Sequence, residues 1–325
     1  MVTEHELNLA ADFIRQGKLV AFPTDTVYGL GANGLDPLAV ARIYELKERP
    51  AFNPLILHVA NLESINELTV AFDERVFALA EKFWPGPLTI LFPKSQLVPD
   101  IVTAGLTTVG IRIPNHRVAL ELIKRAGCPI AAPSANKFGR LSPTNAHHVR
   151  KQLPNLDFVL DGGNTTVGIE STILMLKEEG FEIIRPGSIT AEELRKVVPM
   201  AGVQAPHDKI IAPGMLKSHY SPSKPFYIIG ESLPENLPTR NAGLIAYNFP
   251  KNPGFKKVVQ PTTSGDLKEY AINLFATIHE FEDSDVDFIV AEPVPEQGIG
   301  VAIMDRLRKA THPYDSHNPL SDLRT

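Results

Sequence analysis

The sequence predicts an α/β protein built from two domains. Its 325 residues exceed one ordinary domain of about 100–200 residues. Short apolar runs typical of strands alternate with amphipathic runs typical of helices, which indicates a sheet with helices packed on it. A proline-rich stretch between positions 199 and 225 has no clear period and separates two such regions.

The first region, residues 1–200, predicts a twisted mixed sheet with flanking helices. The expected strands are Leu19–Phe22, Pro54–Val59, Leu88–Phe92, Val109–Ile113, Pro129–Ala132, Phe158–Leu160, Ser171–Leu176 and Glu182–Arg185. The expected helices are Pro37–Lys47, Glu74–Phe83, Arg117–Ala126 and Asn145–Gln152, and a capping-box pattern at Thr190–Glu193 predicts the start of another.

Residues 201–224 form the predicted linker, and residues 225–325 a small βαβ-type domain of ordinary size. The linker is either a plain spacer or, because it carries Pro213-Gly214, His219 and Tyr220, a lid over the site of the first domain. In the second domain the expected strands are Phe226–Ile229, Gly243–Tyr247 and Val286–Ala291. The expected helices are residues 267–281 and Ile299–Ala310.

Composition excludes several classes of protein. The formal net charge of −5 argues against a general nucleic-acid coat, which needs a basic surface. The single cysteine, Cys128, cannot form a disulfide within the chain and is more often buried filler than a nucleophile. The first ten residues lack the apolar core of a signal peptide, and no run approaches the ~18 apolar residues of a membrane span. We therefore expect a cytoplasmic protein without membrane contact.

Common cofactor motifs are incomplete or absent from the sequence. The run Gly29-Leu-Gly-Ala-Asn-Gly34 matches the dinucleotide pattern G-x-G-x-x-G, but Asn53 stands about where that pattern requires an acid. A glycine-rich turn, which lets backbone approach a ligand or a neighbouring strand, is the better interpretation. No P-loop, His-Glu-x-x-His or metal-spaced Cys/His cluster occurs. The sequence therefore does not indicate a P-loop enzyme, a metalloprotease or a zinc protein, and it assigns no metal-binding residues.

Two short motifs form the centre of a candidate active site. Lys47-Glu-Arg49 ends a helix ahead of a strong strand, and two cations on a rigid loop suit a polyphosphate. Cations at a helix end often only cap its dipole, which is the alternative interpretation. Ser134-Ala-Asn136 follows another strand, where successive loop amides can cradle an anion.

Further polar residues stand on or near other strands. Arg112 shares a strand face with Gly110, so it lies either at a sheet edge or in a polar pocket that could capture a carboxylate. His58 is a lone strand histidine, a kind that is more often structural. Asp25 stands between two threonines after the first strand, which a turn with local side-chain bonds would also explain.

Two more strand ends carry a hydroxyl pair, Ser171-Thr172, and a third arginine, Arg185. The complete set offers arginine, lysine, serine and asparagine but almost no pairing of a nucleophile with a base. Such an inventory suits the binding and alignment of anionic substrates more than covalent catalysis.

Taken together, the motifs resemble the YrdC/Sua5 family over essentially the whole chain. The residues that carry the resemblance are Phe22-Pro-Thr-Asp-Thr-Val-Tyr-Gly-Leu-Gly31, Lys47-Glu-Arg-Pro50, Asn53-Pro-Leu55, Phe83-Trp-Pro-Gly-Pro-Leu-Thr89, Arg112-Ile-Pro114, Ala132-Pro-Ser-Ala-Asn136, Gly168-Ile-Glu-Ser-Thr172, Arg185-Pro-Gly187 and His219-Tyr-Ser-Pro222. The resemblance implies a YrdC-like first domain and a small Rossmann-like Sua5 C-terminal domain.

The resemblance also implies an activity. Members of this family are nucleotidyltransferases that form threonylcarbamoyl-AMP and pyrophosphate from L-threonine, bicarbonate and ATP, with Mg²⁺ accompanying the ATP. The product serves the N6-threonylcarbamoylation of adenosine 37 in tRNA, and partner proteins perform the transfer. Weak binding of RNA is a further expectation.

The family pattern implies a role for each matching position. Contacts with L-threonine are expected at Thr26, His58, Arg112, Ala132 (through its backbone) and Ser171. Contacts with ATP are expected at Arg49, Asn53, Thr108, Ser134, Ser142, Arg185 and, from the linker, Tyr220. The catalytic signature comprises Lys47, Arg49, Ser134 and Asn136.

Two other functions compete with this interpretation. The first is a double-stranded RNA-binding module. The acidic net charge argues against RNA binding as the only role of the protein. The second is a carbamoyl-transfer domain with another substrate, as in the related hydrogenase-maturation proteins. Those proteins carry acylphosphatase-like and zinc-finger segments, which this chain lacks.

Overall fold

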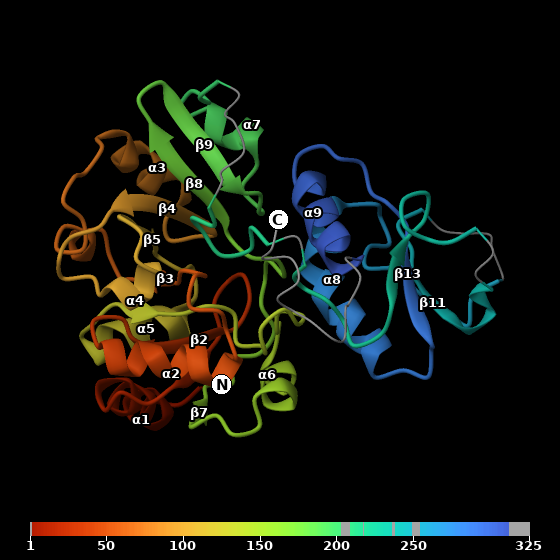
Figure 1. The fold of residues 1–325 in the computed structure, drawn as a ribbon, viewed down its shortest axis with the longest axis horizontal. Helices are drawn as coiled ribbons and strands as arrows, with labels where there is room; N and C mark the ends of the chain where they lie inside the picture. The colour runs from red at the N-terminus through yellow and green to blue at the C-terminus, as the bar shows by residue number, and fades with distance from the viewer. Residues whose placement is uncertain (1, 203–208, 217, 236–237, 249–253, 312–325) are drawn as a thin grey trace. The chain divides into compact units, whose positions relative to one another are not determined.

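The protein folds into two compact units in a computed structural model that describes residues 2–202, 209–216, 218–235, 238–248 and 254–311 (Figure 1). Unit 1 comprises Met1–Phe138 and Ser142–Met215, and unit 2 comprises Gly139–Leu141 and Leu216–Thr325. The division after Met215 falls inside the predicted linker, so the first part of that segment belongs to the first unit.

Unit 1 is organised around a mixed sheet, as predicted. Over the described residues it has nine strands in the order β7-β1-β2-β6-β3-β5-β4-β8-β9. Strands β3 and β5 are parallel, as are β4 and β8, whereas β1 and β2 are antiparallel. The strands are β1 (Val20–Phe22), β2 (Gly29–Asn33), β3 (Ile56–His58), β4 (Leu88–Pro93), β5 (Thr108–Arg112), β6 (Ile130–Ala131), β7 (Phe158–Val159), β8 (Thr172–Lys177) and β9 (Gly180–Arg185).

One face of this sheet, here called the α2 face, carries the larger core. Strand residues such as Leu57, Ile90 and Ile111 pack there against the helices α2 (Pro37–Lys47) and α3 (Arg75–Phe83). The same cluster takes in apolar residues of α6 (Ala146–Gln152) and α7 (Ala191–Arg195). The short helix α4 (Asp100–Thr103) connects the neighbouring strands β4 and β5, and η1 (Glu63–Ile65) lies between β3 and α3 along the chain.

The opposite face, here called the α1 face, is covered in two separate places. Helices α1 (Glu4–Arg15) and α5 (Arg117–Ala126) pack on β1 and β6 through Val20, Phe22 and Ile130. On β3, β4 and β8, the residues Ile56, Leu91 and Ile173 pack instead against Ala212 and its neighbours Ile211 and Met215. Residues 211–215 are therefore a packed cover on the sheet and not a plain spacer.

The glycine-rich run expected to form a turn is strand β2. A Cβ on Gly31 would lie 2.8 Å from the ring of Phe22 and 2.9 Å from Ile130, so only glycine allows the neighbouring strands to pair this closely. Helix α1 was also not predicted. It begins with a capping box in which Thr3 and Glu6 satisfy each other's backbone N–H groups.

Unit 2 contains a wholly parallel sheet in the order β10-β13-β11-β12. This is the Rossmann-like architecture that the resemblance implied. The elements are β10 (Phe226–Ile228), η2 (Thr239–Asn241), β11 (Ala242–Ile245), β12 (Lys257–Val259), α8 (Leu267–Glu282), β13 (Phe288–Ala291) and α9 (Gly300–Thr311). Strand β12, which the sequence did not predict, contains a lysine and a valine that remains exposed.

No helix within the described ranges is long and apolar enough to span a membrane. Cys128 is half-buried, and burial raises the pKa of its thiol to about 11. A thiol with so high a pKa is a poor nucleophile at neutral pH, which agrees with the interpretation of Cys128 as packing.

Candidate active site

The register of two parallel strands sets the layout of the site. Strands β3 and β5 pair so that His58 lies opposite Arg112 at their C-terminal ends. Asn53 precedes β3 and Thr108 begins β5, so both belong to the N-terminal ends. Arg112 lies four residue steps along the strand from Thr108, or about 13 Å. The positions expected for L-threonine and for ATP are thus distributed along these two strands.

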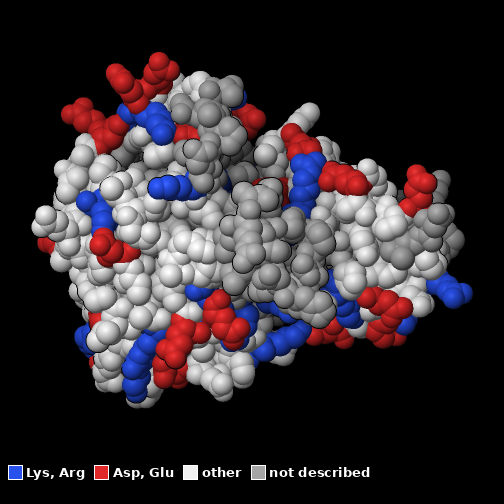
Figure 2. All heavy atoms as spheres, in the orientation of Figure 1, with Lys and Arg blue, Asp and Glu red and all other residues white. Residues whose placement is uncertain are grey.

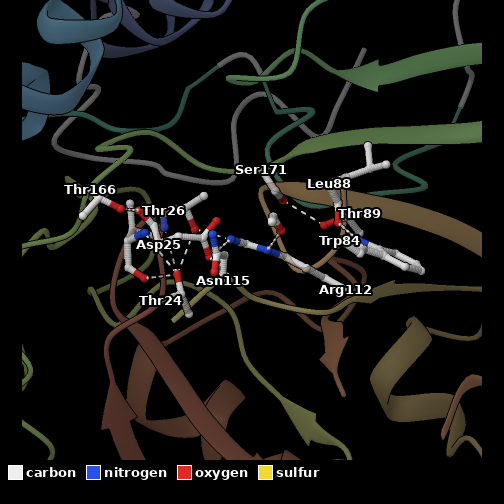
Figure 3. A network of polar contacts seen from close by, with 12 residues as sticks. Thr24, Asp25, Thr26, Trp84, Leu88, Thr89, Arg112, Asn115, Thr166 and Ser171 are labelled. Atoms are coloured by element: carbon white, nitrogen blue, oxygen red, sulfur yellow. Dashed lines mark hydrogen bonds and ion pairs between the residues drawn. The ribbon is translucent and has the colours of Figure 1, made fainter. Parts of the chain in front are cut away.

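Arg112 is the centre of the polar network drawn in Figure 3. Its Nε donates to the carbonyl of Gly86 (3.0 Å), its Nη1 to Thr26 Oγ1 (2.8 Å), and its Nη2 to Asp25 Oδ1. Burial lowers the pKa of Arg112, while the charge of Asp25 and its hydrogen bond oppose that shift. The side chain is 4% exposed, so it lies in the polar pocket that was one of its two predicted environments and not at a sheet edge.

His58 is buried on the same sheet face as Arg112. Burial, helped by the charge of Arg112, lowers the pKa of His58 to about 3, so the ring is neutral at physiological pH. The ring meets the edge of Phe22 with centroids 6.2 Å apart. Its Nδ1 has no hydrogen-bond partner within the described part of the chain. A neutral imidazole here can accept or donate one hydrogen bond without adding charge.

Ser171 and Arg185 meet beside the ends of β8 and β9. Ser171 Oγ lies 2.8 Å from Thr89 Oγ1, and Arg185 Nη2 donates to the carbonyl (2.9 Å) and hydroxyl (3.1 Å) of Ser171. Arg185 Nη1 also donates to the carbonyl of Pro213 (3.1 Å). The cover formed by residues 211–215 is therefore attached to a residue expected to contact ATP.

Lys47 is fully buried and supports the loop that carries the second motif. Its Nζ donates to the carbonyl of Ser134 (2.6 Å) and to that of Asn136. The backbone of Phe138 donates in turn to the Lys47 carbonyl (3.0 Å). Burial lowers the pKa of Lys47 well below its ordinary value, and the charge of Arg49 lowers it further. The two motifs that the sequence singled out are thus joined directly.

Arg49 organises the segment ahead of β3. It donates to the carbonyl of Asn53 through Nε (3.1 Å), and through Nη2 to Asn53 Oδ1 (2.7 Å) and the Pro54 carbonyl (2.8 Å). Both Arg49 and Asn53 are buried. The sequence interpretation of Arg49 as a cation on a rigid loop agrees with this arrangement, since the arginine itself makes the loop rigid.

The remaining expected positions of unit 1 are Thr26, Ala132 and Ser142. The hydroxyl of Thr26 lies 2.9 Å from that of Thr24, and the N–H of Ala132 donates to the carbonyl of Ile56 (2.9 Å). Ser142 is fully buried and donates its hydroxyl to the carboxylate of Glu170.

Tyr220 belongs to unit 2. Its ring packs against Phe275 (centroids 5.4 Å apart), and the guanidinium of Arg306 lies 5.2 Å from its centre. Its backbone has a φ of +61°, a left-handed conformation that is costly for a bulky residue. The expected contact of Tyr220 with ATP remains a prediction.

Sequence reasoning did not assign a role to Asp25 or Thr89, and it left the segment around Pro213 open between a plain spacer and a lid. Asp25 was visible only as a carboxylate between two threonines, and local bonding explained that pattern equally well. Its partner Arg112 is 87 residues away in the chain, so no local signal could reveal the pair. Within the described ranges, no group of three histidine, cysteine or acidic side chains is arranged to hold a metal ion.

Comparisons with known proteins agree over nearly the full chain. Residues 12–187 match a family model described as "Telomere recombination", and residues 189–311 match one described as "Threonylcarbamoyl-AMP synthase, C-terminal domain". The threonylcarbamoyl-AMP synthase of Pyrococcus abyssi is 44% identical over 95% of both chains. That of Bacillus subtilis is 40% identical over 93% of this chain and 91% of its own.

Solved structures give the same result. The structure of Pyrococcus abyssi Sua5 complexed with L-threonine matches with a TM-score of 0.86 and 41% identity, over 96% of this chain and 95% of its own. Escherichia coli YciO matches with a TM-score of 0.52 over 59% of this chain and 94% of its own. At 21% identity, the second match establishes only the shared fold of the first unit.

Proposed function

The chain belongs to the family of threonylcarbamoyl-AMP synthases, and we propose that it condenses L-threonine, bicarbonate and ATP into threonylcarbamoyl-AMP, pyrophosphate and water. The observation that carries the proposal is the pairing of β3 with β5. It groups Arg112 and His58 at one end of the strands and Asn53 and Thr108 at the other. An amino acid and a nucleotide could therefore lie side by side along one sheet face.

In the proposed complex, L-threonine occupies the end of the strands where Arg112 lies. The guanidinium of Arg112 pairs with the carboxylate of the amino acid, for which its planar fork is suited. The neutral ring of His58 and the hydroxyls of Thr26 and Ser171 are available for its polar groups. Ala132 contributes its backbone carbonyl.

ATP occupies the other part of the site. We expect Arg49, Asn53 and Thr108 to contact the adenosine and the phosphates of ATP, and Arg185 to contribute a further cation. Lys47 acts through the loop of Ser134 and Asn136, whose shape it fixes by two hydrogen bonds.

We expect Mg²⁺ to arrive with ATP. The described residues provide no set of carboxylates that would hold it alone, because Asp25 pairs with Arg112 and Glu170 accepts from Ser142. Magnesium bound chiefly by phosphate oxygens and water is a common arrangement. When bound, it would offset charge on the departing pyrophosphate.

The chemistry requires no covalent intermediate on the protein. The unprotonated amine of L-threonine attacks the carbon of bicarbonate or CO₂ to form a carbamate. The reaction with bicarbonate releases a water, and the reaction with CO₂ releases a proton. A carbamate oxygen then attacks the α-phosphorus of ATP, and the bond to the β-phosphate oxygen breaks. The carbamate and the mixed anhydride formed from it both decompose in water, so the cover formed by residues 211–215 suits the reaction by excluding solvent.

We further propose that the product serves the N6-threonylcarbamoylation of adenosine 37 in tRNA through partner proteins, and that the enzyme works in the cytoplasm. A role as an RNA-binding module alone receives little support. On the face shown in Figure 2, acidic and basic side chains are interspersed and form no continuous basic surface among the described residues.

The deciding experiment is release of pyrophosphate from ATP by the purified full-length chain. We expect release to require both L-threonine and bicarbonate. Release without either substrate would refute the proposed reaction. Dependence on a carbamoyl donor other than bicarbonate would favour a carbamoyl-transfer domain. Tight RNA binding with a steep salt dependence, in the absence of turnover, would favour the RNA-binding function.

A further inference from the structure

The ion pair between Arg112 and Asp25 is buried almost completely. The side chains of Arg112 and Asp25 are only 4% and 3% exposed. Figure 3 shows that the pair joins the loop after β1 to the end of β5. Attraction of a substrate carboxylate does not by itself explain this arrangement, because Arg112 is already paired with a carboxylate of the protein.

Asp25 is held in place independently of the arginine. The N–H of Asn115 donates to its Oδ1 (3.1 Å), and the N–H groups of Thr166 (3.1 Å) and Val167 (2.8 Å) donate to its backbone carbonyl. These bonds come from main-chain groups of two separate loops. The backbone of Asp25 is thus fixed by one of these loops, and the N–H of Asn115 in the other orients the carboxylate that pairs with Arg112.

The guanidinium of Arg112 retains capacity for a ligand despite this pairing. Of its five N–H groups, three have partners in the part of the chain that the structure describes. One N–H on each terminal nitrogen is left over. Two such groups match the two oxygens of one carboxylate.

The formal charges of Arg112 and of its ion-pair partner sum to zero. Asp25 cancels Arg112, and the two histidines whose rings interact electrostatically with this pair are neutral. Burial lowers the pKa of His58 to about 3 and also lowers the pKa of His116. A free amino acid at neutral pH is likewise a zwitterion without net charge. Its binding therefore adds no net charge to a site where unbalanced charge is costly.

We propose that Asp25 is a specificity-determining residue, which neutralises and orients Arg112 so that the site accepts the zwitterion of an α-amino acid and rejects a carboxylate of the same shape without the amine. A monoanion would leave one uncompensated negative charge beside the buried pair. Without Asp25 the balance reverses, because Arg112 and a monoanion together are neutral. Asp25 acts through Arg112 and is a positioning residue.

The proposal rests on the proposed function, and its test compares two ligands of nearly equal shape. L-Threonine and (R)-3-hydroxybutyrate have the same configuration at the hydroxyl-bearing carbon and differ by the amine. Their binding to the full chain is measured by calorimetry for wild type and for Asp25→Asn. We expect wild type to prefer L-threonine. In Asp25→Asn the ratio of the two affinities should shift toward 3-hydroxybutyrate by about tenfold or more, equivalent to about 1.4 kcal/mol.

The control is Asp157→Asn, which makes the same change in net charge at a carboxylate that accepts the N–H of Leu19 (3.1 Å). It should leave the ratio at the wild-type value. An equal loss of both affinities in Asp25→Asn, with the ratio unchanged, would mean that Asp25 is merely structural and would overturn the proposal.

Two further measurements keep the outcomes distinct. The fluorescence of Trp84 shows whether Asp25→Asn is folded, and Asp25→Ser, with the same charge and more room for water beside Arg112, replaces it if it is not. Pyrophosphate release by wild type is measured in parallel. Failure there refutes the proposed function, whereas a wild type that binds L-threonine with an unchanged ratio in both variants refutes only the role of Asp25.

Discussion

The buried, neutral histidine of the site predicts a specific loss of stability in acid. At pH 7.5 His58 is neutral in both the folded and the unfolded chain. As the pH falls below 6.5, the ordinary pKa of histidine, His58 of the unfolded chain gains a proton. The folded chain does not, because its pKa is about 3. Since the unfolded state then binds more protons, the free energy of unfolding must fall as the pH falls.

The size of this loss follows from the two pKa values. Each pH unit below 6.5 costs about 1.4 kcal/mol until the folded pKa is reached. Between pH 7.5 and pH 5.0 the contribution of His58 is therefore a destabilisation of about 2 kcal/mol. For a urea dependence of about 2 kcal/mol per molar, the midpoint of unfolding would move by about 1 M.

The assay is urea unfolding of wild type and His58→Gln at both pH values. Trp84, the one tryptophan of the chain, is buried in unit 1 and reports that unit. Other titrating groups act in both proteins and cancel in the comparison. We expect wild type to lose about 2 kcal/mol more than His58→Gln on acidification. His5→Gln, a change at an exposed histidine of α1, should follow wild type.

A pH dependence that is the same in wild type and His58→Gln, within about 0.5 kcal/mol, would refute this reasoning. It would mean that the folded ring takes up a proton as readily as the unfolded one. The same result would mean that His58 is not held neutral in the proposed threonine site.

Three other predictions concern the substrates. Lys47→Met should raise the KM for ATP about tenfold or more and change the KM for L-threonine little, because the Ser134 loop loses both hydrogen bonds from Lys47. Lys137→Met, at an exposed lysine paired with Glu48, is the control. Equal KM values in the two variants would contradict the role of Lys47. Arg112→Lys should raise the KM for L-threonine about 100-fold, the equivalent of about 3 kcal/mol, with the KM for ATP nearly unchanged; parallel effects on both substrates in initial-rate kinetics would exclude a carboxylate role. Ala212→Glu should displace the cover from the sheet, since a carboxylate cannot be buried there unpaired. Turnover should fall while the Trp84 unfolding midpoint stays within about 0.5 M of wild type; full turnover would leave the cover without a role in the reaction.

Much of the first unit could be predicted because its strands and helices have clear local sequence patterns. The strand around Ile56 and the helix from Pro37 to Lys47 are clear from periodicity and from proline positions. Strand β2 was missed because its glycines weaken every strand signal, although close packing against Phe22 and Ile130 requires them. Helix α1 was missed although its capping box was present in the sequence.

The candidate site divides in the same way. Lys47, Arg49, Ser134 and Asn136 could be proposed from the sequence, since cations and loop amides at strand ends suggest anion binding without knowledge of the fold. The structural role of each of these residues could not be predicted, because its hydrogen-bond partners are distant in the sequence. Lys47 holds the loop of Ser134, which lies 87 residues further along the chain.

The sequence by itself therefore determined the α/β class, the two domains and the chemical types gathered at the strand ends, because these depend on local periodicity and on side-chain chemistry. Only the tertiary structure decided that the glycine-rich run is a strand, that residues 211–215 cover the sheet, and that Arg112 is paired with Asp25. The physical reason is that close packing and the balance of buried charge are set by residues brought together from distant parts of the chain. No window of sequence contains both members of such a pair.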